Sequence, residues 1–408
     1  MYYKRHIEKV VKRISKRKPV LVITGARQVG KTTMLKNVFN NLNYVTMNTA
    51  ITRTDAKENP SLFFSHNKRP IIVDEIQKAS ELFEYVKDIV DGEEMLGQFY
   101  LTGSQSFKLM KGVSDSLAGR AGVIQMLGLS LREIKNIDYA EPFKPTKAHV
   151  ETMQKYEVSN FDRLISIIHK GSFPELYKTE SDLKDWKDYY SSYLQTYIEK
   201  DVREIINIQD ETAFIKFIKA VASRTSEQLN YAALSEICGK DEKTVKSWLS
   251  VLQTSGLVYL LQPYHNNLDS RLIKSPKLHF LDTGLACYLL QWNTPEQLYE
   301  GAMWGSIFES YVVGEIIKSY YNDGQIMLPL YYYRDKDKNE VDVIIEEAGT
   351  LYPVEIKTTS DPSPYLAKNF DILKSIPEKK IADGMVICMA KSPSSLSKKV
   401  LAISVDFI

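Results

Sequence analysis

Short apolar runs alternate with amphipathic stretches in the first third of the chain. Strand-like runs occupy residues 19–24, 44–47, 70–74, 98–102 and 122–127, and helical spacing appears between them, as at Met34, Leu35 and Val38. A buried strand followed by a helix, repeated along the chain, is typical of a sheet packed between helical layers. Residues 1–140 are therefore predicted to form a three-layer αβα domain.

The pattern changes after a proline-containing linker at residues 141–145. Residues 141–225 have helical periodicity with many tyrosines, which predicts a helical lid or connector. Residues 226–290 show a helix, a turn at Gly239, a second helix and a strand, the order of a winged helix-turn-helix. Residues 291–408 begin with a long helix at 304–320 and continue with strands, which predicts a small α/β domain.

The first strand runs directly into a glycine loop. Residues 25–32 fit G-x-x-x-x-G-K-[ST], and a helix follows, so the motif lies in the context of a phosphate-binding loop. Lys31 is expected to reach the β- and γ-phosphates, and Thr32 to bind Mg²⁺. The residues predicted to hold ATP are Gly25, Ala26, Arg27, Gln28, Val29, Gly30, Lys31, Thr32 and Thr33.

Two later strands end in polar residues that complete this chemistry. Asp74 and Glu75 follow an apolar strand; Asp74 is predicted to hold the Mg²⁺ and Glu75 to orient the attacking water. Ser104, or alternatively Thr102, follows the next strand and is a candidate to contact the γ-phosphate or the water. The other interpretation is that both hydroxyls only satisfy the backbone of a turn.

Arg120 lies just before the fifth predicted strand. This order of elements resembles the AAA+ ATPases, which place an arginine finger there. The resemblance implies that Arg120 completes the site of a neighbouring subunit, so a homo-oligomeric ring, a hexamer, is expected. The alternative is a surface arginine paired with a local carboxylate. No second sensor arginine is recognisable.

Basic residues cluster on the predicted winged helix. Lys240, Lys243 and Lys246 fall on its second helix, and Arg271, Lys274 and Lys277 lie where a wing is expected. Such residues can neutralise phosphates while the helix lies in a groove, so DNA, duplex or branched, is a predicted partner. The alternative is a protein-docking winged helix.

The last third contains a second candidate site. Glu355 and Lys357 are two residues apart on one strand and share a face, and Asp342 on the preceding strand can join them. Carboxylates of this kind bind Mg²⁺, and the lysine can position a water for phosphodiester cleavage. The arrangement resembles the PD-(D/E)xK nucleases, with Glu309 matching their helix glutamate, although no proline precedes Asp342. The alternative is a nuclease-like fold kept for binding alone.

Composition adds few constraints. The net charge is +2, and three widely separated cysteines match no zinc or disulfide spacing, which favours a reducing cytoplasm. No apolar run approaches the roughly 18 residues of a membrane span, so no membrane association is expected. The basic segment 1–18 has one apolar face and is predicted to be a structural helix.

Together these motifs, with the residues 171–175 and 281–285, resemble a bacterial and archaeal AAA+ ATPase family that carries a carboxyl-terminal domain of unknown function. The resemblance implies ATP binding and action on DNA, and the nuclease-like region is similar to Holliday-junction resolvases. The leading hypothesis is an oligomeric Mg²⁺-ATPase that remodels or translocates branched DNA. The alternatives are an ATP-regulated nuclease and an ATP-controlled protein-docking switch.

Overall fold

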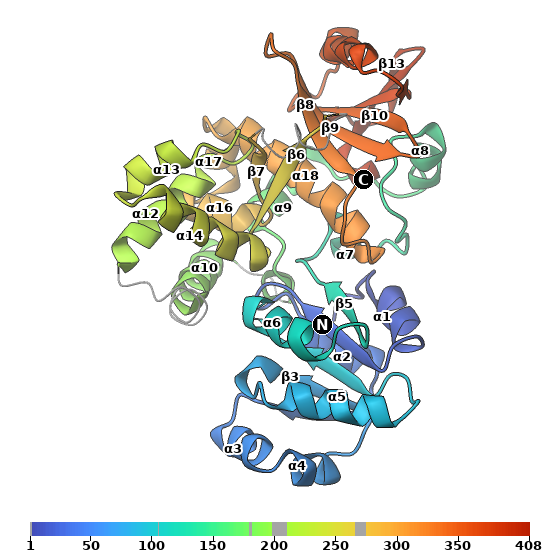
Figure 1. The fold of residues 1–408 in the computed structure, drawn as a ribbon. Helices are drawn as coiled ribbons and strands as arrows, with labels where there is room; N and C mark the ends of the chain where they lie inside the picture. The colour runs from blue at the N-terminus through green and yellow to red at the C-terminus, as the bar shows by residue number, and fades with distance from the viewer. Residues whose placement is uncertain (1, 105, 179–181, 198–209, 266–274) are drawn as a thin grey trace.

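The structure is a computed structural model that describes residues 2–104, 106–178, 182–197, 210–265 and 275–408. Figure 1 shows the amino-terminal α/β region at the bottom, the carboxyl-terminal sheet at the top and a group of helices at the left. The predicted α/β class is confirmed: one parallel sheet is followed by a helical region and a mixed sheet.

The first sheet has five parallel strands in the order β2-β3-β4-β1-β5. Their bounds are β1 Val20–Thr24, β2 Asn43–Thr46, β3 Ile71–Asp74, β4 Phe99–Thr102 and β5 Ala121–Gln125. The central strands β1, β3 and β4 are buried because both faces of the sheet are covered, whereas the edge strands β2 and β5 are partly exposed. The helices around the sheet are α1 Glu8–Ser15, α2 Lys31–Val38, α3 Ala50–Glu58, α4 Pro60–His66, η1 Ile76–Lys78, α5 Leu82–Gly92 and α6 Ser106–Ser116.

Alternation along β1 assigns the covering helices to the two faces. Leu21 and Ile23 share a hydrophobic cluster with side chains of α1 and α2, while Val20 and Val22 share another with side chains of α5 and α6. Since successive strand residues point to opposite faces, this is the three-layer packing that the apolar runs predict.

The segment after β5 packs against the end of the chain. It contains α7 Leu131–Ile134 and α8 Lys147–Met153. The His149 ring lies 2.8 Å from the Phe407 carbonyl, and the Ser159 hydroxyl donates to Asp406 at 2.7 Å. Residues 141–160 therefore lie on the carboxyl-terminal region in Figure 1 and form no part of a lid over the first sheet, contrary to the predicted connector 141–225.

The helical region comprises α9 Phe161–Lys170, η2 Pro174–Tyr177, α10 Leu183–Tyr197, α12 Glu211–Ala222, α16 Thr283–Leu290 and α17 Pro295–Glu300. The aromatic face of α10 is core: Trp186, Tyr190, Tyr193 and Tyr197 are all buried. Trp186 and Tyr190 each contact Tyr288 of α16, with ring centroids 6.0 Å apart in both pairs, and these contacts hold α10 on that helix.

The helix-turn-helix is present as α13 Tyr231–Cys238 and α14 Glu242–Thr254, joined by Gly239 in the left-handed conformation. The strands that follow, β6 Val258–Pro263 and β7 Lys277–Phe280, pair with each other. They also belong to the second sheet, since β6 pairs with β8 at Gln262–Tyr331 and Pro263–Tyr332. The expected wing is thus one edge of the carboxyl-terminal sheet, and this region is no separate winged helix.

The second sheet has nine strands in the order β13-β14-β12-β10-β9-β8-β6-β7, with β11 beside β10. Its remaining strands are β8 Leu330–Arg334, β9 Glu340–Glu347, β10 Thr350–Ile356, β11 Lys380–Ile381, β12 Gly384–Cys388, β13 Ser394–Ser397 and β14 Val400–Ser404. The long helix α18 Trp304–Asn322 is buried along most of its length, and η4 Pro364–Ser375 and η5 Val405–Phe407 complete the region.

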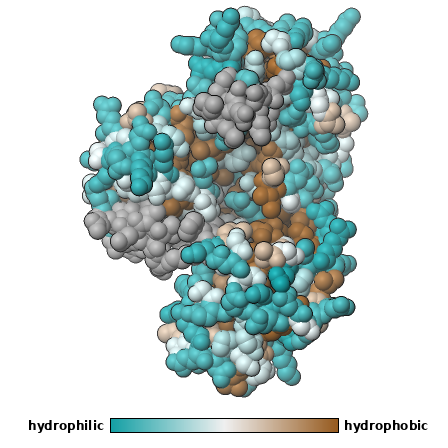
Figure 2. Space-filling model, in the orientation of Figure 1, coloured by the Kyte–Doolittle hydropathy of each residue, from teal (hydrophilic) through white to brown (hydrophobic). Residues whose placement is uncertain are grey.

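Among the described helices, none has the length and apolarity needed to cross a membrane. On the face shown in Figure 2, hydrophobic atoms gather between the amino-terminal and carboxyl-terminal regions, and most of the remaining described surface is hydrophilic.

Two buried histidines predict acid destabilisation. Burial lowers the pKa of both His149 and His169 to about 4. The unfolded chain, with an ordinary histidine pKa near 6.5, then binds more protons than the folded one between about pH 6.5 and 4. Stability is therefore expected to be complete above about pH 6.5 and to fall as the pH drops below it, by about 3 kcal/mol per histidine. Urea unfolding midpoints measured from pH 7.5 to 4.5 test this, and His169→Gln should flatten the slope; a pH-independent midpoint would contradict it.

Candidate nucleotide site

The glycine loop joins β1 to α2 with three residues at positive φ: Gly25, Gln28 and Gly30. A Cβ on Gly25 would lie 2.0 Å from the Met126 carbonyl oxygen, so only glycine fits there. Lys31 begins α2 and is buried, and its Nζ donates to the carbonyls of Gly25 at 2.8 Å and Ala26 at 2.7 Å. The loop therefore brings an ammonium group and a helix N-terminus to the same point, as phosphate binding requires.

Asp74 ends β3 beside the start of α2. Its Oδ1 accepts from the hydroxyls of Thr32 at 2.7 Å and Thr102 at 2.5 Å. Tyr44 donates to the other oxygen at 3.2 Å. A carboxylate and a hydroxyl held this close are hard oxygen donors of the kind that Mg²⁺ takes, so Thr32 and Asp74 fit the ion predicted for them.

Glu75 follows in the left-handed conformation, with φ of 58°. Ser104 donates to its Oε2 at 3.1 Å and Gln77 donates to the same oxygen at 2.5 Å. A non-glycine residue at positive φ is uncommon and is often found at functional sites. Ser104 thus contacts the predicted base, whereas Thr102 contacts the predicted metal ligand.

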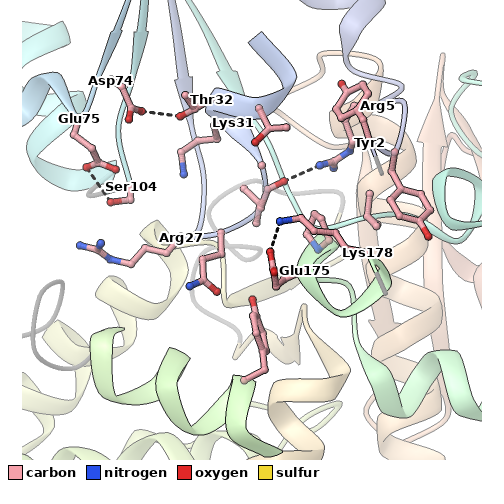
Figure 3. Close-up of a pocket in the computed structure, with 18 of the residues that line it drawn as sticks. Tyr2, Arg5, Arg27, Lys31, Thr32, Asp74, Glu75, Ser104, Glu175 and Lys178 are labelled. Carbon is pink, nitrogen blue, oxygen red and sulfur yellow. Dashed lines mark hydrogen bonds and ion pairs between the residues drawn. The ribbon is translucent and has the colours of Figure 1, made fainter. Parts of the chain in front are cut away.

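The loop residues 27–33, Asp74, Glu75 and Ser104 line one cavity of about 700 Å³, a size suited to a nucleotide. In Figure 3 the loop residues, Asp74 and Glu75 lie on one side, while Glu175 and Lys178 form an ion pair on the opposite wall. The full lining is Tyr2, Tyr3, Arg5, Arg27, Gln28, Val29, Gly30, Lys31, Thr32, Thr33, Asp74, Glu75, Ser104, Leu129, Pro174, Glu175, Lys178, Tyr189 and Thr196. Of the predicted nucleotide residues, only Gly25 and Ala26 are absent from it.

Sequence reasoning missed two groups of lining residues. Tyr2, Tyr3 and Arg5 come from the segment before α1, and Arg5 is tied to the loop because its guanidinium donates to the Val29 carbonyl at 2.8 Å. The other group comes from η2 and α10 of the helical region. In the sequence, the motif at residues 171–175 is part of the family resemblance. It is the one sequence feature discussed above that belongs to this wall of the nucleotide cavity.

The profile of an AAA domain matches residues 17–135. This part of the chain is an AAA ATPase domain. Two further profiles, each described as a domain of unknown function, match residues 161–296 and 304–408.

Two relatives with similar sequences bear the name uncharacterized protein. A protein of Mycobacterium tuberculosis is 28% identical over 358 residues, which cover 86% of this chain and 73% of that protein. A protein of Methanocaldococcus jannaschii is 25% identical over 343 residues, covering 75% of this chain and 69% of that protein.

Solved structures resemble this chain only in part. A Walker-type ATPase of Pyrococcus abyssi matches with a TM-score of 0.45 and 12% identity, over 71% of this chain and 96% of that one. The RuvB Holliday junction branch migration motor of Thermotoga maritima matches with a TM-score of 0.30 and 17% identity, over 62% and 87%. Similarity at this level gives no information about the substrate of this chain.

Arg120 of the AAA domain lies outside the cavity of its own chain. It directly precedes β5, at the amino-terminal end of a parallel sheet whose carboxyl-terminal ends carry the site. Its Nη2 donates to Asp91 at 2.7 Å, and the pair is partly exposed. Within one subunit Arg120 is thus a surface arginine paired with Asp91. Its role as an arginine finger in the site of a neighbouring subunit stays a prediction.

The carboxyl-terminal candidates come together as predicted, but with lysines between them. Asp342 on β9 and Glu355 on β10 lie on adjacent strands, and Lys357 Nζ is 2.6 Å from Glu355 Oε1 and 3.3 Å from Asp342 Oδ2. Glu309 on α18 pairs with Lys277 at 2.8 Å. Burial raises the pKa of Glu309 to about 7 and that of Glu355 to about 8.

The prediction of a second metal site at Glu309, Asp342, Glu355 and Lys357 does not fit this geometry. In the part of the chain that the structure describes, no group of three or more histidine, cysteine, aspartate or glutamate side chains is placed to hold a metal ion. The physical reason is that Lys277 and Lys357 already pair with one oxygen each of Glu309, Asp342 and Glu355.

The predicted DNA contacts divide into three groups. Lys277 is wrong as a phosphate contact, because it is only 4% exposed and is paired with Glu309 and Glu340. Lys240 pairs with Asp210 at 2.7 Å, Lys246 pairs with Glu242 at 3.4 Å, and Lys243 is exposed. Arg271 and Lys274 lie outside the described residues.

Proposed function

We propose that this chain is an oligomeric Mg²⁺-dependent ATPase whose hydrolysis cycle drives remodelling or translocation of DNA, with branched DNA as its substrate. One observation carries the proposal: the nucleotide cavity has one wall from the AAA domain and another from the helical region that adjoins the helix-turn-helix. Loss of the γ-phosphate on hydrolysis would therefore alter the contacts of the nucleotide with both walls of the cavity.

The residues of the site divide the work between them. Lys31 and the loop amides bind the phosphates, and Thr32 and Asp74 hold the ion. Bound magnesium would neutralise the charge that develops on the transferred phosphoryl group. Glu75 accepts a proton from the attacking water and orients it, while Ser104 and Gln77 fix the position of its carboxylate.

Lys243 and the exposed face of α14 support the DNA part of the proposal, since phosphate binding needs unpaired cations on a helix that can enter a groove. The ion pairs of Lys240 and Lys246 favour the second candidate, a protein-docking switch, because both reduce the available positive charge.

Adding a four-way DNA junction is expected to raise the ATPase rate severalfold and to shift the protein to a larger particle. The rate and the particle mass by light scattering are measured together in 50 and 200 mM salt. Binding that weakens steeply with salt supports phosphate contacts. The matched variant Lys243→Ala should weaken binding without altering the rate measured without DNA. No salt-dependent binding to either duplex or junction would reject the DNA proposal and favour protein docking.

A further inference from the structure

The acidic centre of the carboxyl-terminal region is built from four carboxylates and two lysines. The carboxylates are Glu309 on α18, Glu340 and Asp342 on β9, and Glu355 on β10; the lysines are Lys277 on β7 and Lys357 after β10. Every one of the four acids lies within an ion-pair distance of a lysine. This differs from a metal centre, where carboxylates converge on an open position.

Lys277 is the unusual member. Its Nζ lies 2.8 Å from Glu309 Oε1 and 2.6 Å from Glu340 Oε1, and its side chain is 5% exposed. Burial alone would lower the pKa of Lys277, but Glu309, Asp342 and Glu340 together raise it above its ordinary value. The side chain therefore carries a fixed positive charge among the acids, supplied by β7 at the edge of the second sheet.

Lys357 cannot take over this role. It is 40% exposed and bonds to Asp342 and Glu355, whereas Glu309 and Glu340 pair with Lys277. Oε2 of Glu355 is buried and makes no hydrogen bond within the described part of the chain. Removing the Lys277 charge would therefore leave Glu309 without its lysine and Glu340 with Arg334, whose Nε is 3.8 Å from Oε2, in a cluster where one Glu355 oxygen already makes no hydrogen bond.

We propose that Lys277 is a resident cation that fills the acidic centre of the nuclease-like region, replaces a divalent metal there, and ties β7 to α18 and β9. The region consequently holds no hydrolytic metal in the wild-type chain, and its contribution is binding or support. Lys277 also links the helix-turn-helix side of the second sheet to the nuclease-like side. The proposal does not depend on the ATPase site.

Manganese reports on the cluster directly. Crystals of the nucleotide-free, full-length wild-type protein soaked in Mn²⁺ are expected to show no anomalous peak between Glu309, Asp342 and Glu355. In solution, Lys277→Met is expected to bind one Mn²⁺ more tightly than wild type by about tenfold or more, measured by the loss of the free-ion electron paramagnetic resonance signal. The gain should disappear in Lys277→Met/Glu309→Gln.

The matched control is Lys243→Met, the same chemical change at an exposed lysine, which should bind Mn²⁺ as wild type does. A manganese peak held by Glu309, Asp342 and Glu355 in the wild-type crystal would overturn the proposal. A folded Lys277→Met with no gain in Mn²⁺ affinity would overturn it as well. The soak needs no variant, so it decides the question even where Lys277→Met does not fold.

Discussion

Glu75→Gln is expected to bind ATP as tightly as wild type and to hydrolyse it about 10²–10⁴-fold more slowly. The glutamine side chain has the same size as glutamate, and its amide oxygen can still accept hydrogen bonds from Ser104 and Gln77. It cannot accept the proton of the attacking water, which is the step that the carboxylate performs. Fluorescent ATP-analogue titration gives the affinity, and phosphate release gives the rate.

Lys31→Ala provides the contrasting variant, because it removes the ammonium that binds the phosphates and should lose affinity as well as turnover. Ser104→Ala is the matched control for the carboxylate: it removes only the hydrogen bond that positions Glu75, so its rate should fall less than that of Glu75→Gln. Equal turnover in Glu75→Gln and wild type would mean that another group activates the water.

The amino-terminal half of the site could be predicted because its signals are local. A phosphate loop needs glycine at fixed positions between a strand and a helix, and Asp74 and Glu75 needed only an apolar strand before them. Parallel strands bring their carboxyl ends to one edge, so the loop, Asp74 and Ser104 meet without any further information.

The opposite wall could not be predicted in the same way. Glu175 and Lys178 reach the cavity only because η2 and α10 fold back on the AAA domain, about 150 residues after the loop. Lys277 shows the same limit, since its sequence context predicts a loop and a DNA contact. In the structure β7 pairs with β6, and β6 pairs with β8, so that β7 belongs to the second sheet. The Lys277 side chain on β7 is therefore buried among acids that are distant in sequence.

Asp282→Asn is expected to destabilise the folded protein by about 3 kcal/mol or more, because the buried carboxylate accepts four hydrogen bonds. Its Oδ2 accepts from the Ser172 amide and hydroxyl, both at 2.7 Å, and its Oδ1 accepts from Tyr190 and the Leu285 amide, also at 2.7 Å. An asparagine amide group would present N–H to one of these donor pairs. The melting temperature should fall by about 6–12 °C.

The same variant should weaken nucleotide binding more than it slows turnover. Ser172 leads directly into Pro174 and Glu175 of the cavity wall, and Tyr190 adjoins Tyr189, which also lines the cavity. A loosened wall raises the KM for ATP, whereas Glu75 and Ser104 stay in place on the AAA domain and preserve kcat. Tyr190→Phe is the matched control, since it removes a single donor and should cost about 1 kcal/mol. An unchanged melting temperature and KM in Asp282→Asn would show that the wall is held in another way.

Two glycines near Asp282, one in the motif 171–175 and one in the motif 281–285, allow these two segments to pack closely together. A Cβ on Gly284 would lie 2.2 Å from the Tyr190 hydroxyl, and one on Gly171, at φ of 86°, would lie 2.8 Å from Asp282 Oδ1. The turn at residues 171–175 and the helix start at residues 281–285 can approach closely only without these side chains. The two motifs therefore form one packed contact, which connects the nucleotide cavity to the helices beside the second sheet.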